Sequence, residues 1–263
     1  MGRKNTIQKT AWLLLAAATL TSCAKNENPG IDNGGDTPGT SLLVTEAKLD
    51  GETLARYEYN AQNQLIAGHA YLNGQHSSTA EYTYDGRGRL LVVTNMLADG
   101  SLISTVEHAY ADNDDKPVSA ITTSHVGEVV QWDMTYSYSD NQLTETIIQP
   151  APAPEFVTVY TYTDNGDILS VETNLGGIWA GTTEYGDYDD KNSPSILGNP
   201  FAWKVPSRHN HRSLKSTGPE GVTEDKVYKY TYNDSGYPVK AEIYNRGEDE
   251  VVQTIETSYK KAN

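Results

Sequence analysis

The sequence predicts an all-β protein: an antiparallel meander of about 15 strands, built from about seven repeats of about 26 residues and curled into a wide open or closed barrel-like sheet. Three observations predict this fold. A Tyr-x-Tyr motif recurs at even spacing, apolar and polar residues alternate around it, and turn-forming Asn, Asp and Gly separate the alternating runs. No segment after residue 41 has a helical period.

The chain begins with a predicted signal peptide, residues 1–22, which is set aside from the fold. Its apolar run from Ala11 to Leu20 is too short to span a bilayer. The following Leu20-Thr21-Ser22-Cys23 resembles the bacterial lipobox, which implies cleavage before Cys23, lipidation of its thiol and a stable lipid anchor in the outer membrane. The alternative is an ordinary secretory signal that happens to precede the single cysteine.

Residues 23–41 are predicted to be the lipidated cysteine and a flexible tether, because Asn, Gly, Pro and Asp leave little to bury. Ala24-Lys25-Asn26-Glu27 resembles the export signal of Bacteroidota surface lipoproteins, although it carries one acid where that signal has a run. The resemblance implies display on the cell surface rather than a periplasmic location.

Residues 42–263 form the predicted single repeat domain. The second tyrosines of the motif are Tyr59, Tyr84, Tyr110, Tyr138, Tyr162, Tyr188, Tyr232 and Tyr259. Between these points lies a second set of turns, such as Asn73-Gly74 and Asp99-Gly100, whose residues supply the positive φ of tight hairpins. Each repeat is therefore expected to be one strand, a turn, a second strand and another turn.

Two resemblances bear on the fold. Tyr82 to Leu90, followed by Ala98-Asp99-Gly100, resembles the YD repeat of Rhs toxins and teneurins, whose strands wind into β-shells. Residues 188–194 (Tyr-Asp-Asp-Lys-Asn-Ser-Pro) and Asn199-Pro200-Phe201 resemble a family of Bacteroidales lipoproteins of unknown function with a porin-like fold. The second resemblance covers most of residues 42–263, implies about 15 strands in a wide barrel, and implies no activity.

Composition narrows the function. A net charge of -15 at pH 7 argues against nucleic acid as a partner. A membrane-spanning porin needs a continuous apolar band on alternate strand positions. Here one face of the strands carries Glu, Lys, Asp and Thr, and the mean hydropathy is -0.58, so a barrel that does not contact lipid is expected.

One interval between second tyrosines is about 18 residues longer than the others. The predicted insertion, residues 195–219, has two interpretations. As a binding loop, it would offer a stacking platform at Trp203 and cations for carboxylate or sulfate. As a plug, it would close the barrel with its aromatic side chains. The candidate ligand-binding residues of the first interpretation are Phe201, Trp203, Arg208, His209, His211 and Arg212.

Metal and catalytic signals are weak. His209-Asn210-His211 has no third ligand at a fixed spacing. The acidic turns offer oxygen ligands for calcium at Asp112, Asp114, Asp187 and Asp189, although acids also favour plain turns. The sequence contains no nucleophile elbow and no phosphate-binding loop. We therefore expect no catalytic residue, no cofactor and no enzyme activity, with a glycosidase-like carboxylate pair as the remaining alternative.

The tyrosines themselves are open to two interpretations, a structural ladder or an adhesive surface for sugar rings. Their regular recurrence favours the ladder. The leading hypothesis is a non-catalytic, outer-membrane-anchored lipoprotein that binds a glycan or another extracellular macromolecule. The alternative is an assembly component that joins a protein partner through exposed strand edges.

Overall fold

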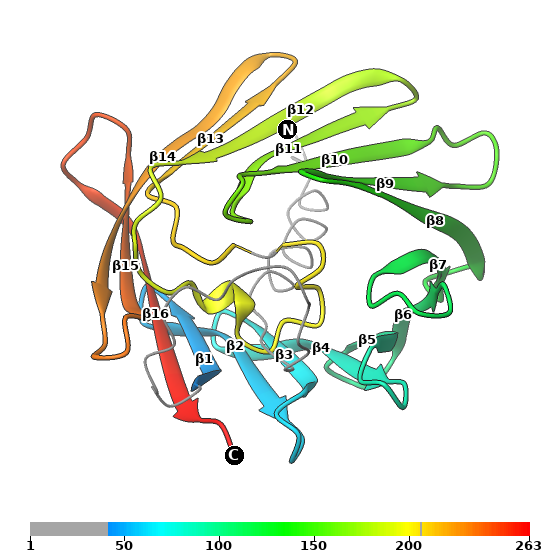
Figure 1. The fold of residues 1–263 in the computed structure, drawn as a ribbon, viewed down its shortest axis with the longest axis horizontal. Coiled ribbons are helices and arrows are strands. Elements are labelled where there is room, and N and C mark those ends of the chain that lie inside the picture. Colours follow the sequence, from blue (N-terminus) through cyan, green and yellow to red (C-terminus); the bar gives the residue numbers. More distant parts are fainter. Residues whose placement is uncertain (1–41, 206) are drawn as a thin grey trace, which may run out of the picture.

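The structure, a computed structural model, describes residues 42–205 and 207–263. It confirms the all-β meander and resolves the open question of closure, because the strands form a closed antiparallel barrel in which β1 pairs with β16 (Figure 1). The signal peptide, Cys23 and the tether lie outside the described residues. The strands are β1 (Leu42–Leu49), β2 (Glu52–Tyr59), β3 (Leu65–Leu72), β4 (Gln75–Tyr84), β5 (Leu90–Leu97), β6 (Leu102–Tyr110), β7 (Pro117–Ser124), β8 (Val130–Ser139), β9 (Gln142–Ile148), β10 (Phe156–Tyr162), β11 (Ile168–Leu175), β12 (Ile178–Gly186), β13 (Ser213–Gly218), β14 (Gly221–Tyr232), β15 (Pro238–Asn245) and β16 (Val251–Lys261).

The barrel has two ends, which we name by their turns. The tyrosine end carries the turns that follow the Tyr-x-Tyr motifs, together with the start of β1 and the end of β16. The distal end carries the other hairpin turns, at residues 50–51, 73–74, 98–101, 125–129, 149–155, 176–177, 219–220 and 246–250. Positive φ at Asn73, Gly74 and Gly100 confirms the tight hairpins predicted there.

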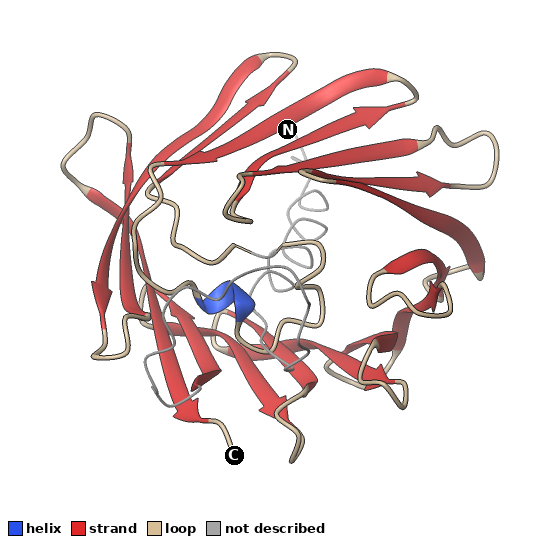
Figure 2. Cartoon of the chain, in the orientation of Figure 1, coloured by secondary structure: helices blue, strands red, loops and turns tan. Residues whose placement is uncertain are grey.

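A long connection between β12 and β13 crosses the inside of the ring of strands (Figure 1). We call residues 187–212 the internal loop. It contains one short 3₁₀ helix, η2 (Pro194–Ile196), which lies inside the barrel in Figure 2. The connection ends at Arg212 rather than at Pro219, because Ser213–Gly218 alternates against β12 and β14 as a strand.

The second tyrosine of the repeat is a structural residue. Its hydroxyl donates a hydrogen bond to a backbone carbonyl near the start of an earlier strand, which connects neighbouring hairpins at the tyrosine end. The pairs are Tyr59 to Val44 (2.8 Å), Tyr84 to Leu65 (2.7 Å), Tyr110 to Leu90 (2.7 Å), Tyr138 to Pro117 (2.8 Å), Tyr188 to Ile168, and Tyr259 to Pro238 (2.7 Å). Tyr162 departs from the pattern and donates to the carbonyl of Lys204 in the internal loop, at 2.6 Å.

The strands curve at the same point of the repeat. In five hairpins the register shifts beside the second tyrosine, at Tyr59, Tyr84, Tyr110, Tyr162 and Tyr232. A β-bulge increases local twist and bends a strand. Its repetition gives the sheet the curvature that barrel closure requires.

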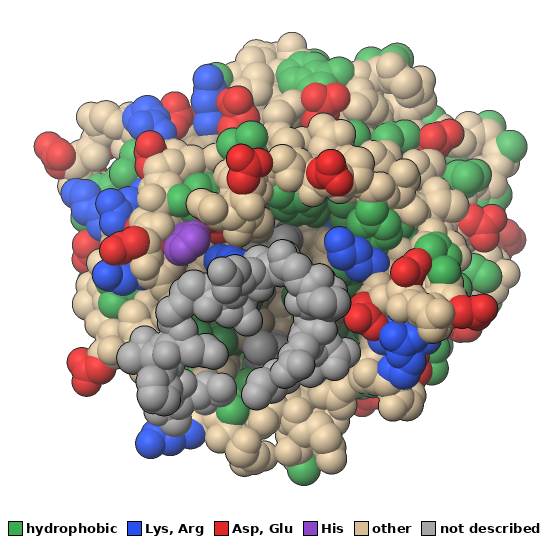
Figure 3. Space-filling view, in the orientation of Figure 1, with side chains coloured by type: hydrophobic (Ala, Val, Ile, Leu, Met, Phe, Trp, Pro, Cys, Tyr) green, Lys and Arg blue, Asp and Glu red, His purple; other side chains and the backbone are tan. Residues whose placement is uncertain are grey.

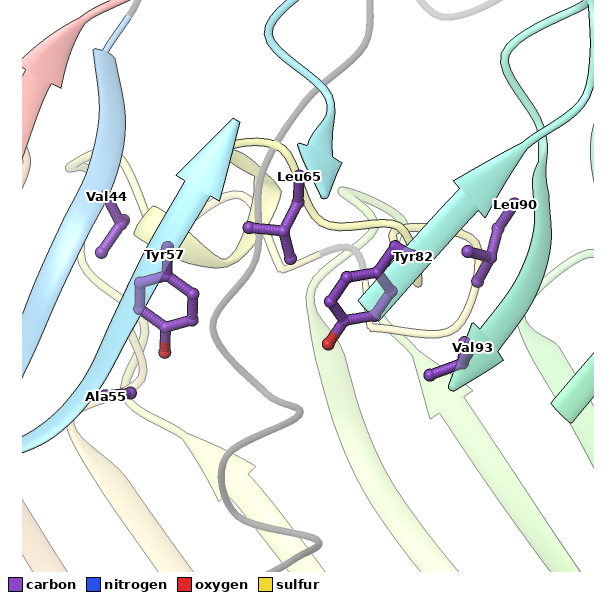
Figure 4. Close-up of a cluster of buried hydrophobic side chains, with 7 residues drawn as sticks. All are labelled: Val44, Ala55, Tyr57, Leu65, Tyr82, Leu90 and Val93. Atoms are coloured by element: carbon purple, nitrogen blue, oxygen red, sulfur yellow. The ribbon is translucent and has the colours of Figure 1, made fainter. Parts of the chain in front are cut away.

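The core lies on the inner face of the sheet. One buried cluster gathers Val44, Ala55, Tyr57, Leu65, Tyr82, Leu90 and Val93, with Phe201 packed against it (Figure 4). A second gathers Ala120, Tyr136, Leu143, Tyr160 and Ile168, with Trp203 packed against it. The internal loop therefore supplies an aromatic side chain to each half of the core.

The outer face carries many polar side chains, beside exposed aliphatic ones such as Leu91, Val118 and Ile121. Across β2 to β8, one outward row of directly paired residues reads Glu58, Ala67, Glu81, Thr94, Thr105, Thr123 and Gln131. Exposed ion pairs also lie on the barrel wall, at Arg56 and Glu46 (2.9 Å) and at Lys240 and Glu242 (2.7 Å). Figure 3 shows acidic and basic side chains interspersed on the viewed face.

Candidate functional site in the barrel lumen

The internal loop is fastened inside the barrel by two buried carboxylates. Lys204 Nζ lies 2.6 Å from Glu145 on β9 and 5.1 Å from the centre of the Tyr160 ring. Burial alone would lower the pKa of Lys204, but the neighbouring Tyr160 and Glu145 raise it above its usual value, so the side chain stays charged. Asp167 accepts a hydrogen bond from His209 Nδ1 at 2.8 Å and others from the backbone N–H groups of Arg208 and His209.

Phe201 and Trp203 point into the lumen, as a plug would. The Trp203 ring lies edge-on to Tyr136, with 4.9 Å between centroids, and 6.1 Å from the ring of His108. Phe201 lies 6.3 Å from Tyr82. Trp203 is therefore held between core side chains and does not stand on the outer surface as a stacking platform. Within the described part of the chain, His108 Nδ1 and Trp203 Nε1 are the buried side-chain atoms without a hydrogen-bond partner.

The remaining loop candidates do not meet at one site. His211 packs against Tyr185 and Tyr228, with ring centroids 5.1 and 4.8 Å away, and burial lowers its pKa to about 4. The backbone N–H of Arg208 donates a hydrogen bond to the Asp167 carboxylate, and the backbone N–H of Arg212 donates one to the carbonyl of Gly186. The six candidates thus divide between an aromatic pair in the lumen and residues that fix the return of the loop to β13.

The four acidic candidates differ in their contacts, and of their carboxylates that of Asp189 accepts hydrogen bonds from the protein. The backbone carbonyls of Asp112 and Asp114 accept hydrogen bonds from Arg87 and Arg89 of the neighbouring turn. The Asp189 carboxylate accepts from the backbone N–H groups of Lys191 and Asn210 and from the hydroxyl of Tyr232. Asp187 has a positive φ of 53°. Across residues 42–205 and 207–263, no group of three His, Cys, Asp or Glu is arranged to hold a metal ion.

A pocket opens in the wall formed by β2 to β6, on the side of the lumen where Phe201 lies. This lumenal pocket has a volume of about 230 Å³. It exists because inward positions on three consecutive strands carry small side chains. Those residues are Ala55, Gly68, Ala70, Ser78 and Ala80. Aromatic rings of Tyr57, Tyr82 and Phe201 complete it.

The pocket is not among the sites expected from the sequence, because small side chains define it rather than chemistry-bearing ones. The signal in the sequence is a run of Ala, Gly and Ser at inward alternate positions, beside the tyrosines of the repeated motif. That signal becomes readable only once the inward face is known.

By fold and site the chain is a closed antiparallel β-barrel whose lumen is partly filled by its own internal loop. It is similar to a porin-like protein from Bacteroides vulgatus, with a TM-score of 0.52 and 14% identity over 82% of this chain and 98% of that one. A porin-like protein from Bacteroides uniformis gives a TM-score of 0.51 and 12% identity over 84% of this chain and 98% of that one. These likenesses confirm the porin-like fold expected from the sequence and extend to the fold alone.

No protein-family model matches the chain, and no curated protein matches it. Among the described residues, no helix has the length and apolar character needed to cross a membrane.

Proposed function

We propose that the protein is an outer-membrane-anchored lipoprotein, displayed on the cell surface, whose barrel is a non-catalytic binding module for a glycan or another extracellular macromolecule. The lumenal pocket carries this proposal, because it is a preformed hollow lined by aromatic and small side chains with a few polar groups. It replaces Trp203 as the ligand platform, since Trp203 is packed among core rings.

Two features support anchoring rather than spanning. The lipobox at Cys23 supplies a membrane attachment of its own. The outward strand positions carry charged and hydroxyl side chains, such as Glu58 and Glu81, where a lipid-facing barrel carries an apolar band. Strand β1 begins with residue 42 at the tyrosine end, so a tether that precedes it would hold that end toward the membrane and present the distal end outward.

The non-catalytic assignment draws support from the surroundings of Glu145. A glycosidase-like site needs two carboxylates that face each other across a substrate. Glu145, opposite Tyr136 in the sheet, is paired with Lys204 at 2.6 Å instead. That ion pair fits a structural fastening of the internal loop.

The binding proposal is tested on the lipidated protein, purified in detergent and applied to a glycan array. Ala80→Leu fills the pocket from its wall, whereas Thr83→Leu adds the same side chain to the outer face of the same strand. Capture of a glycan by the unmodified protein and by Thr83→Leu, with loss in Ala80→Leu, is the expected result. Capture that survives in Ala80→Leu would place the ligand elsewhere.

Assembly with a protein partner is the second candidate function, and one observation favours it. Strand edges do not serve it, because each described strand pairs on both sides in the closed barrel. The distal turns and the strand ends beside them instead expose large aliphatic side chains, including Val126 (69%), Ile178 (74%) and Val222 (57%). The same turns carry the carboxylates Asp50, Asp99, Glu128, Glu155, Glu220, Glu248, Asp249 and Glu250 against a single cation, Arg246.

Such a surface suits a partner with basic residues around an apolar patch. Co-purification from detergent-solubilised outer membrane should then yield a stoichiometric basic protein that is lost from the Val126→Ser, Ile178→Ser double variant. A monomer in both preparations would remove this candidate.

A further inference from the structure

The lumenal pocket contains two tyrosines that differ in their bonding from the second tyrosines of the repeat. Tyr57 and Tyr82 occupy the first position of the Tyr-x-Tyr motif, and their side chains are buried, at 7% and 6% exposure. Seven of the eight second tyrosines donate their hydroxyl to a backbone carbonyl, as Tyr84 does to Leu65, and Tyr232 donates to the Asp189 carboxylate. Within the part of the chain that the structure describes, the hydroxyls of Tyr57 and Tyr82 have no such partner, and both residues line the pocket.

The Tyr57 and Tyr82 hydroxyls face the same part of the lumenal pocket. Gly68 on β3 pairs with Tyr57 on β2, and Tyr82 follows Ala80, the partner of Gly68 on β4. A Cβ atom on Gly68 would lie 3.7 Å from Tyr57 Cδ1 and 3.8 Å from the Tyr82 hydroxyl. The lack of a side chain at Gly68 therefore leaves the space between the two tyrosines open. Figure 4 shows both hydroxyls directed to the side of the cluster where Ala55 and Val93 lie.

The chemistry of the pocket favours an uncharged ligand. Burial raises the pKa of both phenols, to about 12 for Tyr82, so both remain protonated donors at neutral pH. Among the residues that the structure describes, no Lys, Arg, Asp or Glu lines the pocket. His69 borders the pocket, but its imidazole turns toward the outer face, where it contacts Thr79 at 3.0 Å and Glu58 at 3.2 Å. An ionised ligand would therefore lose its hydration without gaining a counter-charge.

The pocket walls favour a ligand ring that has both apolar faces and hydroxyl groups. Phe201 and the two tyrosines supply aromatic surface, and Ser78 and Asn95 supply further hydrogen-bonding groups. A volume of about 230 Å³ lies below the roughly 300–1,000 Å³ of common small-molecule sites, so the pocket fits one ring rather than a chain. A sugar residue presents C–H groups to aromatic faces and hydroxyls to phenols.

From this geometry we infer that the lumenal pocket binds a single neutral sugar residue, the terminal unit of a glycan, with the Tyr57 and Tyr82 hydroxyls hydrogen-bonded to its hydroxyl groups. The inference rests on the proposed glycan-binding function and specifies its ligand class. The pocket excludes charged sugars, and internal residues of a chain do not enter it.

The test uses the lipidated protein in detergent, titrated by calorimetry with neutral methyl glycosides of glucose, galactose, mannose and N-acetylglucosamine. A methyl glucuronide is the charged probe, and methylcyclohexane is the ring without hydroxyls. We expect one or more neutral glycosides to bind and the other two probes to stay silent. Tyr57→Phe and Tyr82→Phe, which each remove one oxygen, should weaken binding of the neutral glycoside five- to tenfold.

The matched control is Tyr84→Phe in the same repeat. It removes a hydroxyl bonded to Leu65, so it should lower the thermal midpoint and leave glycoside affinity unchanged. If glycan capture on the array is blocked by Ala80→Leu but Tyr57→Phe and Tyr82→Phe bind normally, or if methylcyclohexane binds equally well, the inference is wrong and the proposed function stands. If the array captures no glycan at all, the proposed glycan-binding function itself fails.

Discussion

At the scale of single residues, one position of the repeat contains a substitution with a measurable consequence. His108 stands where other repeats have the first tyrosine, and it is 6% exposed in the core beside Trp203. Burial, with a smaller contribution from the charge of Lys204, lowers the pKa of His108 to about 4. The imidazole is thus neutral in the folded protein at pH values where an unfolded chain would protonate it.

Stability should therefore decrease as the pH falls from about 6.5 toward about 4, because the unfolded state binds the proton and the folded state does not. For His108 alone the free energy of unfolding should drop by roughly 2 kcal/mol between neutral pH and pH 5. His108→Phe should make the decline shallower in urea titrations at a series of pH values. His76→Phe, at an exposed position, is the control, and equal slopes in all three proteins would contradict the assignment.

At the scale of elements, the internal loop is part of the core rather than a surface appendage. Trp203→Ala should lower the free energy of unfolding by about 3 kcal/mol, the cost of removing a large ring from a packed interior. Trp179→Ala is the matched control, since Trp179 is 37% exposed on β12 and should lose less than about 1 kcal/mol. Chemical denaturation of both variants provides the measurement, and equal losses would show that the loop does not pack as described.

The strands and turns were predictable because each repeat encodes them locally. Alternation and turn residues within about 26 positions determine a hairpin, and the second tyrosine marks its end. One strand beyond the expected 15 or so, β13 (Ser213–Gly218), was not predicted, because it lies inside the long interval and carries no tyrosine motif. The path of the internal loop could not be predicted either, since Lys204 finds Glu145 across 59 residues and no local pattern specifies such a contact.

At the scale of the whole molecule, the lipid anchor proposed at Cys23 would determine where the barrel is held. The proposed lipidation makes the Cys23 thiol the acyl acceptor, so Cys23→Ala should leave an unprocessed precursor without lipid mass. Intact-mass spectrometry and N-terminal sequencing of membrane fractions measure both properties. A processed chain with a mature N-terminus at another residue would refute the lipobox.

Closure itself was left open by the sequence, because curvature accumulates from bulges whose geometry no single repeat reveals. The outcome has a consequence for biosynthesis. Leu42 and Lys261, paired across the β1–β16 seam, are 219 positions apart in the chain (261 minus 42). The first strand must therefore remain with one edge unpaired until the last strand has been made. Slow, long-range pairing of this kind exposes a chain to aggregation before the barrel closes. A chaperone that holds the unfolded chain would therefore benefit this barrel more than a sheet in which strands pair only with their neighbours in sequence.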